Sequence, residues 1–296
     1  MNHYDYIVAG LCLRSNIDLV KVGLRGFRPF ESHEQGIEAD CTFAISTEIS
    51  ICDYVVEQRL SDTYVAEADA NSSFMRVNGG YLYTIDRRDG DGQAAIFHID
   101  TRSNHITTNL ECNTVNDISL LRFGIWIMFG VVLAANRAIA IHSSVIESHG
   151  RCVLFLGESG TGKSTHTRLW RENIEDAHLL NDDSPIIRFI DNQTIVYGSP
   201  WSGKTPCYKN LSYPIAGICR LSQAPHNAIR RLSTIASIGA VLPSCPPQYA
   251  HDEYLQDCIC STLSDILRRV GVYHLECLPN AEAAQLSHST IIGDEQ

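Results

Sequence analysis

The chain has 296 residues, of which 44% are hydrophobic and 19% are charged, and these values exclude a disordered or fibrous protein. The formal net charge of −11 argues against a nucleic-acid partner, because phosphate backbones are bound mainly by Lys and Arg. The N-terminal residues show no basic segment followed by an apolar run, so we expect no signal peptide. The 11 cysteines are scattered without a CxxC pair, which indicates reduced thiols in a cytoplasmic protein.

Residues 1–112 are predicted to form a β-rich N-terminal domain. Short runs of β-branched and aromatic residues are separated by Gly, Asp and Asn, which is the pattern of strands joined by turns. The NGG sequence at 78–80 predicts a hairpin, and RRDGDGQ at 87–93 predicts a solvated turn between two more strands. No catalytic spacing occurs in this half, so we expect it to serve packing or partner recognition.

Residues 113–137 predict one long helix that links the two halves of the chain. The segment starts with capping residues and then continues without a turn signal. Its most apolar part, residues 123–136, contains 14 uncharged residues, which are too few to span a bilayer. We therefore expect a buried helix and no membrane partner.

Residues 138–296 predict the second domain, in which apolar strands alternate with helices. This alternation favours a layered α/β sheet. Near the C-terminus, residues 252–271 predict an amphipathic helix, residues 272–279 a strand and residues 280–291 a closing helix.

Residues 157–164 read GESGTGKS and match the pattern G-x-x-x-x-G-K-[ST] at every fixed position. An apolar strand enters this loop and a helix leaves it. The glycines let successive N–H groups face one anion, and the positive end of the helix adds to their field. We therefore predict binding of ATP, or of another nucleoside triphosphate, together with Mg²⁺. The predicted cofactor-binding residues are Gly157, Glu158, Ser159, Gly160, Thr161, Gly162, Lys163, Ser164 and Thr165.

Two adjacent acids, Asp182 and Asp183, end an apolar run that follows the loop helix. One helix and one short strand fit between loop and acids, so we expect the pair at the same sheet edge as the loop. In this interpretation one of the two acids holds the metal together with Ser164, and the other accepts the proton of a hydroxyl. Lys163 draws charge from the transferred group. The structural alternative is an Asp-Asp turn before a proline.

These residues resemble the kinase core of HPr kinase/phosphorylase, a family similar to the ATP-dependent phosphoenolpyruvate carboxykinases. The likeness is carried by IHSSVIESHGRCVLFLGESGTGKSTHTRLW and the later HLLNDD, covers residues 138–190, and extends in outline to residue 290. The resemblance implies that His142 is the strand histidine that contacts or orients phosphate. It also implies that Asp183 accepts the proton of a protein serine, which leaves Asp182 to hold the metal with Ser164. A core histidine with a backbone partner is the alternative for His142.

The chain departs from this family after the acid pair. Where the bifunctional enzymes carry an acidic residue and an arginine, this chain has Ile195, Val196 and Tyr197, which argues against phosphorylase activity. The following GSPWSGK supplies a second glycine-rich turn, in which Lys204 is predicted to neutralise a phosphate. The alternative for Lys204 is a solvated lysine in a turn between two strands. Trp201 either covers a base or acceptor, or seals the core. This layout is closer to the HPr-kinase-like proteins found beside peptide-modification systems.

Other basic residues are weaker candidates for contact with an anion. We expect His166 to face outward on the loop helix and Arg168 to be solvated. Arg220, Arg230 and Arg231 form either an anion-facing cluster or a solvated face.

The sequence therefore predicts an α/β P-loop kinase domain, similar to the C-terminal domain of HPr kinase, preceded by a mostly antiparallel β domain. The leading hypothesis for its function is that it is a Mg²⁺-dependent serine kinase that acts on a protein or peptide. Two alternatives remain open: a nucleotide-binding accessory protein that transfers no phosphate, and a small-molecule kinase. A homo-oligomer is also left open.

Overall fold

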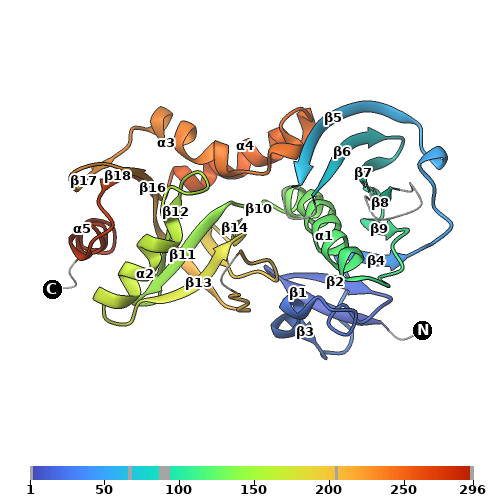
Figure 1. The fold of residues 1–296 in the computed structure, drawn as a ribbon, viewed down its shortest axis with the longest axis horizontal. Helices are drawn as coiled ribbons and strands as arrows, with labels where there is room; N and C mark the ends of the chain where they lie inside the picture. The colour runs from blue at the N-terminus through green and yellow to red at the C-terminus, as the bar shows by residue number, and fades with distance from the viewer. Residues whose placement is uncertain (1–2, 66–68, 87–93, 204–205, 294–296) are drawn as a thin grey trace. The chain divides into compact units, whose positions relative to one another are not determined.

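The computed structural model describes residues 3–65, 69–86, 94–203 and 206–293. The chain divides into two compact units, each built around its own sheet (Figure 1). Unit 1 consists of Met1–Asn136 and Pro247–Asp257, and unit 2 consists of Arg137–Pro246 and Cys258–Gln296. The turn predicted at residues 87–93 and the predicted site residue Lys204 lie outside the described residues.

The sheet of unit 1 has nine strands in the order β3-β1-β2-β4-β9-β8-β7-β6-β5. Strand β4 pairs in parallel with both β2 and β9, so the sheet is mixed. The hairpin predicted at residues 78–80 is confirmed, because Val77 and Gly80 are paired where β6 turns into β7. The strands are β1 (Tyr4–Val8), β2 (Leu11–Ser15), β3 (Glu31–Ser32), β4 (Cys41–Ile45), β5 (Val56–Val65), β6 (Ala70–Val77), β7 (Gly80–Ile85), β8 (Ala95–Asp100) and β9 (His105–Thr108).

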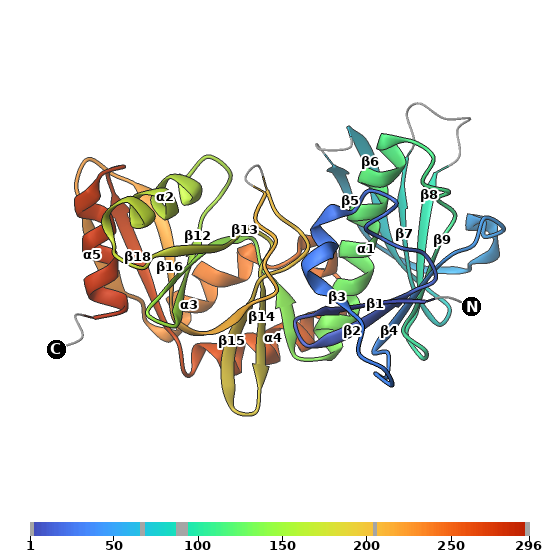
Figure 2. The same ribbon diagram turned by 90° about the horizontal axis from the view of Figure 1, so that it is seen from below.

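One long apolar helix, α1 (Val115–Ala135), packs against β7 and β8 (Figures 1 and 2). It begins with a capping box, in which the side chains of Thr114 and Asp117 each accept a hydrogen bond from the other residue's N–H. Gly130 lets Tyr249 approach the helix closely, because a Cβ atom there would lie 2.1 Å from the tyrosine hydroxyl oxygen. That hydroxyl donates a hydrogen bond into the helix backbone.

Among the described residues, α1 is the one helix whose length and composition would allow it to cross a membrane. However, 67% of its most apolar window is buried inside the protein. Ile125, Met128 and Phe129, for example, are fully buried. This burial is typical of the core helix of a soluble protein, so the buried helix expected from the sequence is found.

The segment Pro247–Asp257 is tied to unit 1 through Asp252, whose side chain is fully buried. The carboxylate accepts hydrogen bonds from the Tyr81 hydroxyl at 3.0 Å and from the Leu255 N–H at 2.9 Å. It also pairs with the guanidinium of Arg76. One carboxylate therefore caps the start of α4 (Glu253–Leu267) and also accepts hydrogen bonds from two side chains of the sheet, Tyr81 and Arg76.

The sheet of unit 2 also has nine strands, and its path runs β10-β14-β15-β16-β12-β11-β13, with β18 pairing β16 and β17. The first residues of the long strand β16 pair antiparallel with β15, and its later residues pair in parallel with β12 and β18. The strands are β10 (Ala138–Ala140), β11 (Ser143–Ser148), β12 (Arg151–Leu156), β13 (His178–Asp183), β14 (Ile186–Ile190), β15 (Gln193–Tyr197), β16 (Ser212–Gln223), β17 (Ala228–Arg231) and β18 (Gly271–Cys277).

Helices α2 and α5 pack against each other over strands of this sheet. Helix α4, strand β18 and helix α5 lie where the sequence predicts a helix, a strand and a closing helix. The remaining helices are α2 (Lys163–Asn173), α3 (Thr234–Val241), α5 (Ala281–Ile291) and the short 3-10 helices η1 (Arg25–Phe30), η2 (Ile51–Asp53), η3 (Leu242–Ser244) and η4 (Pro247–Tyr249).

The expected fold class, an α/β P-loop kinase domain behind a mostly antiparallel β domain, is wrong. The described residues contain 38% strand and 29% helix, arranged as two large mixed sheets with few helices. The physical reason is that neighbouring antiparallel strands are joined by tight turns and not by crossover helices. His149 and Gly150 have positive φ between β11 and β12, as do Asp191 and Asn192 between β14 and β15. Such two-residue turns join antiparallel strands directly.

Candidate functional site

The candidate site lies at one edge of the second sheet, where β12, β11 and β13 meet. Strand β11 lies between the other two and runs antiparallel to both, since Ser144 is paired with Phe155 on one side and with Asp182 on the other. The carboxyl ends of β12 and β13 therefore share an edge with the amino end of β11. This arrangement places the loop 157–162, His142 and the acid pair together.

The loop turns back on itself before it enters α2. The N–H and the hydroxyl of Thr161 donate hydrogen bonds to the Glu158 carbonyl oxygen at 3.1 and 2.8 Å. Gly162 caps α2 with a φ of 110°, a left-handed value that side chains rarely tolerate. The side chains of Glu158 and Ser159 are exposed at the outer turn. The N–H groups of the first turn of α2 have no partners within the helix, so this end favours an anion.

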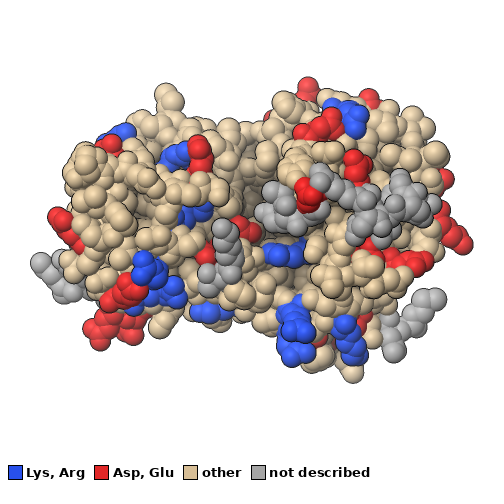
Figure 3. All heavy atoms as spheres, in the orientation of Figure 1, with Lys and Arg blue, Asp and Glu red and all other residues tan. Residues whose placement is uncertain are grey.

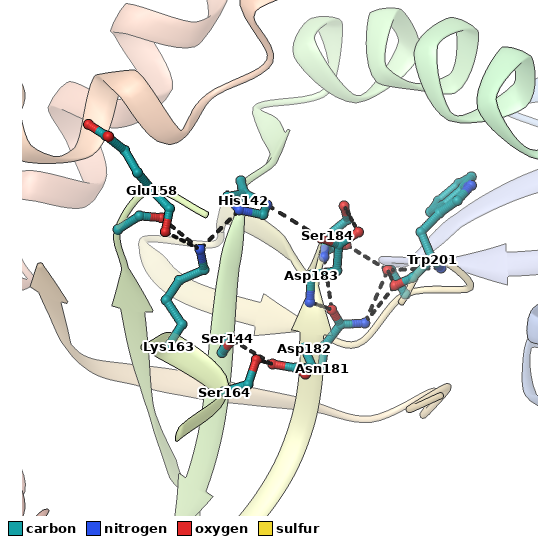
Figure 4. Close-up of polar contacts among 12 residues, drawn as sticks. His142, Ser144, Glu158, Lys163, Ser164, Asn181, Asp182, Asp183, Ser184 and Trp201 are labelled. Atoms are coloured by element: carbon teal, nitrogen blue, oxygen red, sulfur yellow. Dashed lines mark hydrogen bonds and ion pairs between the residues drawn. The ribbon is translucent and has the colours of Figure 1, made fainter. Parts of the chain in front are cut away.

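Lys163 lies across the inner side of the loop (Figure 4). Its Nζ donates hydrogen bonds to the Gly157 carbonyl oxygen at 2.6 Å and to His142 Nε2 at 3.0 Å. Burial lowers the pKa of Lys163, and the negative charges of Asp183 and Asp182 oppose that shift. The ammonium group is therefore partly desolvated, which strengthens its attraction to an anion at the loop.

His142 lies between Lys163 and Asp183 (Figure 4). Its Nε2 accepts from Lys163, because an ammonium group can only donate, and the proton of the neutral ring is then on Nδ1. Nδ1 lies 3.4 Å from Asp183 Oδ1. The imidazole is half-exposed, and its backbone N–H is held by the Ser244 carbonyl at 2.8 Å. One imidazole therefore joins the loop lysine to the second acid.

Asp182 is buried and faces the first turn of α2. Its Oδ1 accepts hydrogen bonds from the hydroxyls of Ser144 at 2.6 Å and Ser164 at 3.1 Å. Carboxylate and hydroxyl oxygens are ligands that Mg²⁺ takes, and this ion usually keeps several waters and substrate phosphates as its other ligands. The donor set of Ser164 and Asp182 fits Mg²⁺ on these terms. The described residues contain no group of three or more His, Cys, Asp or Glu side chains arranged for a metal.

Asn181, which carries no motif in the sequence, fixes the turn that carries Asp183. This side chain is fully buried, and its Oδ1 accepts from the N–H groups of Asp183 and Ser184, both at 3.0 Å. Its Nδ2 donates to the Trp201 carbonyl oxygen at 2.9 Å and to the Ser199 hydroxyl at 3.3 Å. Asn followed by Asp is typical of a turn, so the turn itself could be predicted from the sequence. The bonds to Ser199 and Trp201 could not, because these partners lie about 20 residues later in the chain.

The segment 199–203 lies close to the acid pair. Gly203 allows this approach, because a Cβ atom there would lie 2.9 Å from the Asp182 carbonyl oxygen. The Ser199 hydroxyl donates to the Ser184 carbonyl oxygen at 2.6 Å. The Trp201 side chain is only 3% exposed, which supports the interpretation that it seals the core.

Arg220 lies next to the loop, because β16 places it beside Leu156 at the end of β12. Its guanidinium donates to the Ala240 carbonyl oxygen and lies 3.8 Å from the Glu158 carboxylate. Arg230 lies two strands away and contacts His274. Of the arginines that the sequence grouped together, Arg220 is therefore the one placed at the loop.

The remaining residues of the loop helix do not all lie as expected. Arg168 is exposed and pairs with Glu172 along the helix, as a solvated arginine does. The expectation that His166 faces outward is wrong, because its side chain is 3% exposed. Its Nε2 lies 3.0 Å from the Ser287 hydroxyl on α5, which also accepts from Trp170 Nε1 at 2.9 Å. Burial lowers the pKa of His166 to about 4.

No protein-family model matches the sequence, and a search of the curated proteins gives no match either.

Replacing Asn181 by Ala should lower the free energy of unfolding by about 3 kcal/mol, because buried donors and acceptors lose their partners. Urea denaturation measures this loss. Asn173→Ala is the matched control, since Asn173 makes one hydrogen bond, to a carbonyl oxygen of its own helix. Equal losses in the two variants would show that Asn181 does not hold the turn.

His166 should make the protein less stable in acid. Its pKa of about 4 in the folded chain is below the value of 6.5 expected after unfolding, so the unfolded chain binds more protons between these values. Stability from this group is complete above pH 6.5 and is lost as the pH falls toward 4. The stability gap between wild type and His166→Gln should narrow by about 2 kcal/mol from pH 7 to pH 5.

Urea denaturation at several pH values measures this gap. His178→Gln, which removes an exposed imidazole, is the control for loss of a histidine. Parallel stability curves for wild type and His166→Gln would contradict the assignment.

Proposed function

We propose that the chain is a Mg²⁺-dependent phosphotransferase that moves the γ-phosphoryl group of a nucleoside triphosphate to a serine hydroxyl of a protein or peptide. The observation that carries the proposal is the position of His142, which lies between Lys163 and Asp183. Holding a nucleotide requires the loop and its lysine, but transfer also requires a group that positions and deprotonates the acceptor. Here a cationic group and a carboxylate are joined through one imidazole.

Lys163 and the N–H groups of the loop balance the negative charge of the phosphates. Ser164 and Asp182 would hold Mg²⁺, which would supply positive charge to offset the charge of the phosphates. The hydrogen bond from Ser144 keeps the Asp182 carboxylate turned toward Ser164. These groups act before transfer and place the γ-phosphorus near Asp183.

Asp183 accepts the proton of the serine hydroxyl as the new bond between oxygen and phosphorus forms. The bond between the γ-phosphorus and the oxygen bridging to the β-phosphate breaks, and the nucleoside diphosphate leaves with that electron pair. His142 orients the Asp183 carboxylate through its Nδ1 proton. Asn181 keeps the backbone of the same acid in place.

The choice of a serine acceptor rests on the sequence resemblance to the HPr kinase family at residues 142–183. The fold class that this resemblance implied is not found. The support for a serine acceptor therefore comes only from His142, the loop 157–164 and the acids Asp182 and Asp183. All 11 cysteines are free thiols, which supports a cytoplasmic location. On the face drawn in Figure 3, basic side chains are dispersed among acidic and uncharged ones, consistent with a nucleotide and a protein as partners rather than a nucleic acid.

Asp183→Asn should lower the rate of phosphoryl transfer at least about 100-fold, because the general base is lost. The affinity for Mg²⁺–ATP should stay within about twofold of wild type, since the substitution leaves the loop intact. Transfer from γ-labelled ATP to proteins of a cell lysate measures the rate. Asp176→Asn is the matched control, because Asp176 is exposed and its left-handed backbone accepts Asn readily.

A labelled protein band that persists unchanged in Asp183→Asn would contradict the assigned base. Binding of Mg²⁺–ATP by wild type without any transfer would favour the accessory protein instead.

A further inference from the structure

A cavity of about 640 Å³ lies beside the loop in unit 2. It is lined by the loop and the first two turns of α2, by the end of β16 and the turn after it, and by the residues that follow β18. Strands β12, β16 and β18 are parallel to one another, so their carboxyl ends meet at this edge. Crevices outside the carboxyl ends of parallel strands are common ligand sites.

The cavity follows one side of α2. Gly162, Thr165 and Leu169 line it, and their spacing of three and four residues places them on one helix face. Ser164 is turned the other way, toward Asp182. The loop therefore has a catalytic side, which faces the acid pair, and a second side that opens into the cavity.

We propose that this cavity binds the base and sugar of a nucleoside triphosphate whose phosphates lie along the loop, so that the phosphoryl donor is a nucleotide rather than an inorganic polyphosphate. This inference rests on the proposed function and extends its site by one further region. With the γ-phosphate near Lys163, the chain of phosphates runs to the first turn of α2. The cavity begins at that turn, where Thr165 lies.

The cavity walls have the chemistry that a nucleobase requires. Leu221 and Leu278, with the neighbouring prolines of the lining, present apolar surface on which a flat ring can pack. The amide Nε2 of Gln223 donates a hydrogen bond to the Gly160 carbonyl oxygen at 3.3 Å. The Oε1 of the same amide can then accept a hydrogen bond from a substituent of the base. The inner wall includes the buried His166, whose Nε2 is held by the Ser287 hydroxyl at 3.0 Å.

The test compares Mg²⁺–ATP with Mg²⁺–tripolyphosphate, which has three phosphates and no base, by calorimetric titration. Wild type should bind ATP more tightly than tripolyphosphate. Ala224→Phe fills the cavity and Leu278→Ser removes an apolar wall, so each should weaken ATP binding about tenfold. Their affinity for tripolyphosphate should not change, which also shows that the loop is still folded. Leu211→Ser is the control, because Leu211 is a partly exposed leucine outside the cavity lining.

The outcomes separate this inference from the proposed function. If wild type binds ATP and tripolyphosphate equally and Ala224→Phe changes neither, the base site is overturned while the phosphate site stands. If the cavity variants impair only transfer to the protein acceptor, the base site is likewise overturned. If wild type binds neither ligand, the proposed function has failed and the base site fails with it. Lys163→Ala should weaken the binding of ATP and of tripolyphosphate by the same factor, because Lys163 contacts only the phosphates in this proposal.

Discussion

The central position of β11 determines where the groups of the candidate site lie. Because β11 pairs antiparallel with both β12 and β13, the loop, the histidine and the acids reach the same edge without a long connection. Ser144 on β11 then donates to Asp182 on β13, which in turn contacts Ser164 on α2. A slip of one residue would turn Ser144 and Asp182 to opposite faces. Buried residues on both faces of β11 oppose such a slip.

Two buried polar side chains, Asn181 and Ser287, support the groups at this edge. Asn181 holds the turn of the acid pair against the segment 199–203, because its side chain hydrogen-bonds to both stretches. Ser287 of α5 contacts His166 and Trp170, one turn apart on α2. Because the loop ends in the first turn of α2, fixing that helix also fixes the loop. The lysine and the acids thus meet through rigid elements, which favours precise positioning of reacting groups.

The loop and the acid pair could be predicted from the sequence, because each is a local motif of a few neighbouring residues. His142 was predicted only through the resemblance to the HPr kinase family. The long buried helix was also predictable from its length and apolar composition. The fold class was predicted wrongly, because the general alternation of strands and helices does not hold where the positive-φ turns at 149–150 and 191–192 join antiparallel strands directly. His166 and Asn181 were missed or misplaced because their partners, such as Ser287, lie far away in the chain. Such contacts exist only after the sheet has formed.

The most direct test of the account is the EPR spectrum of Mn²⁺ titrated with ATP and protein, because Mn²⁺ accepts the same oxygen ligands as Mg²⁺. We expect a protein-bound Mn²⁺ signal that requires ATP, since in the proposed site Ser164 and Asp182 would share the ion with phosphates. Asp182→Asn should weaken this binding about tenfold, whereas Asp191→Asn in the distant hairpin turn should not change it. A Mn²⁺–ATP spectrum that wild-type protein leaves unchanged would contradict the account.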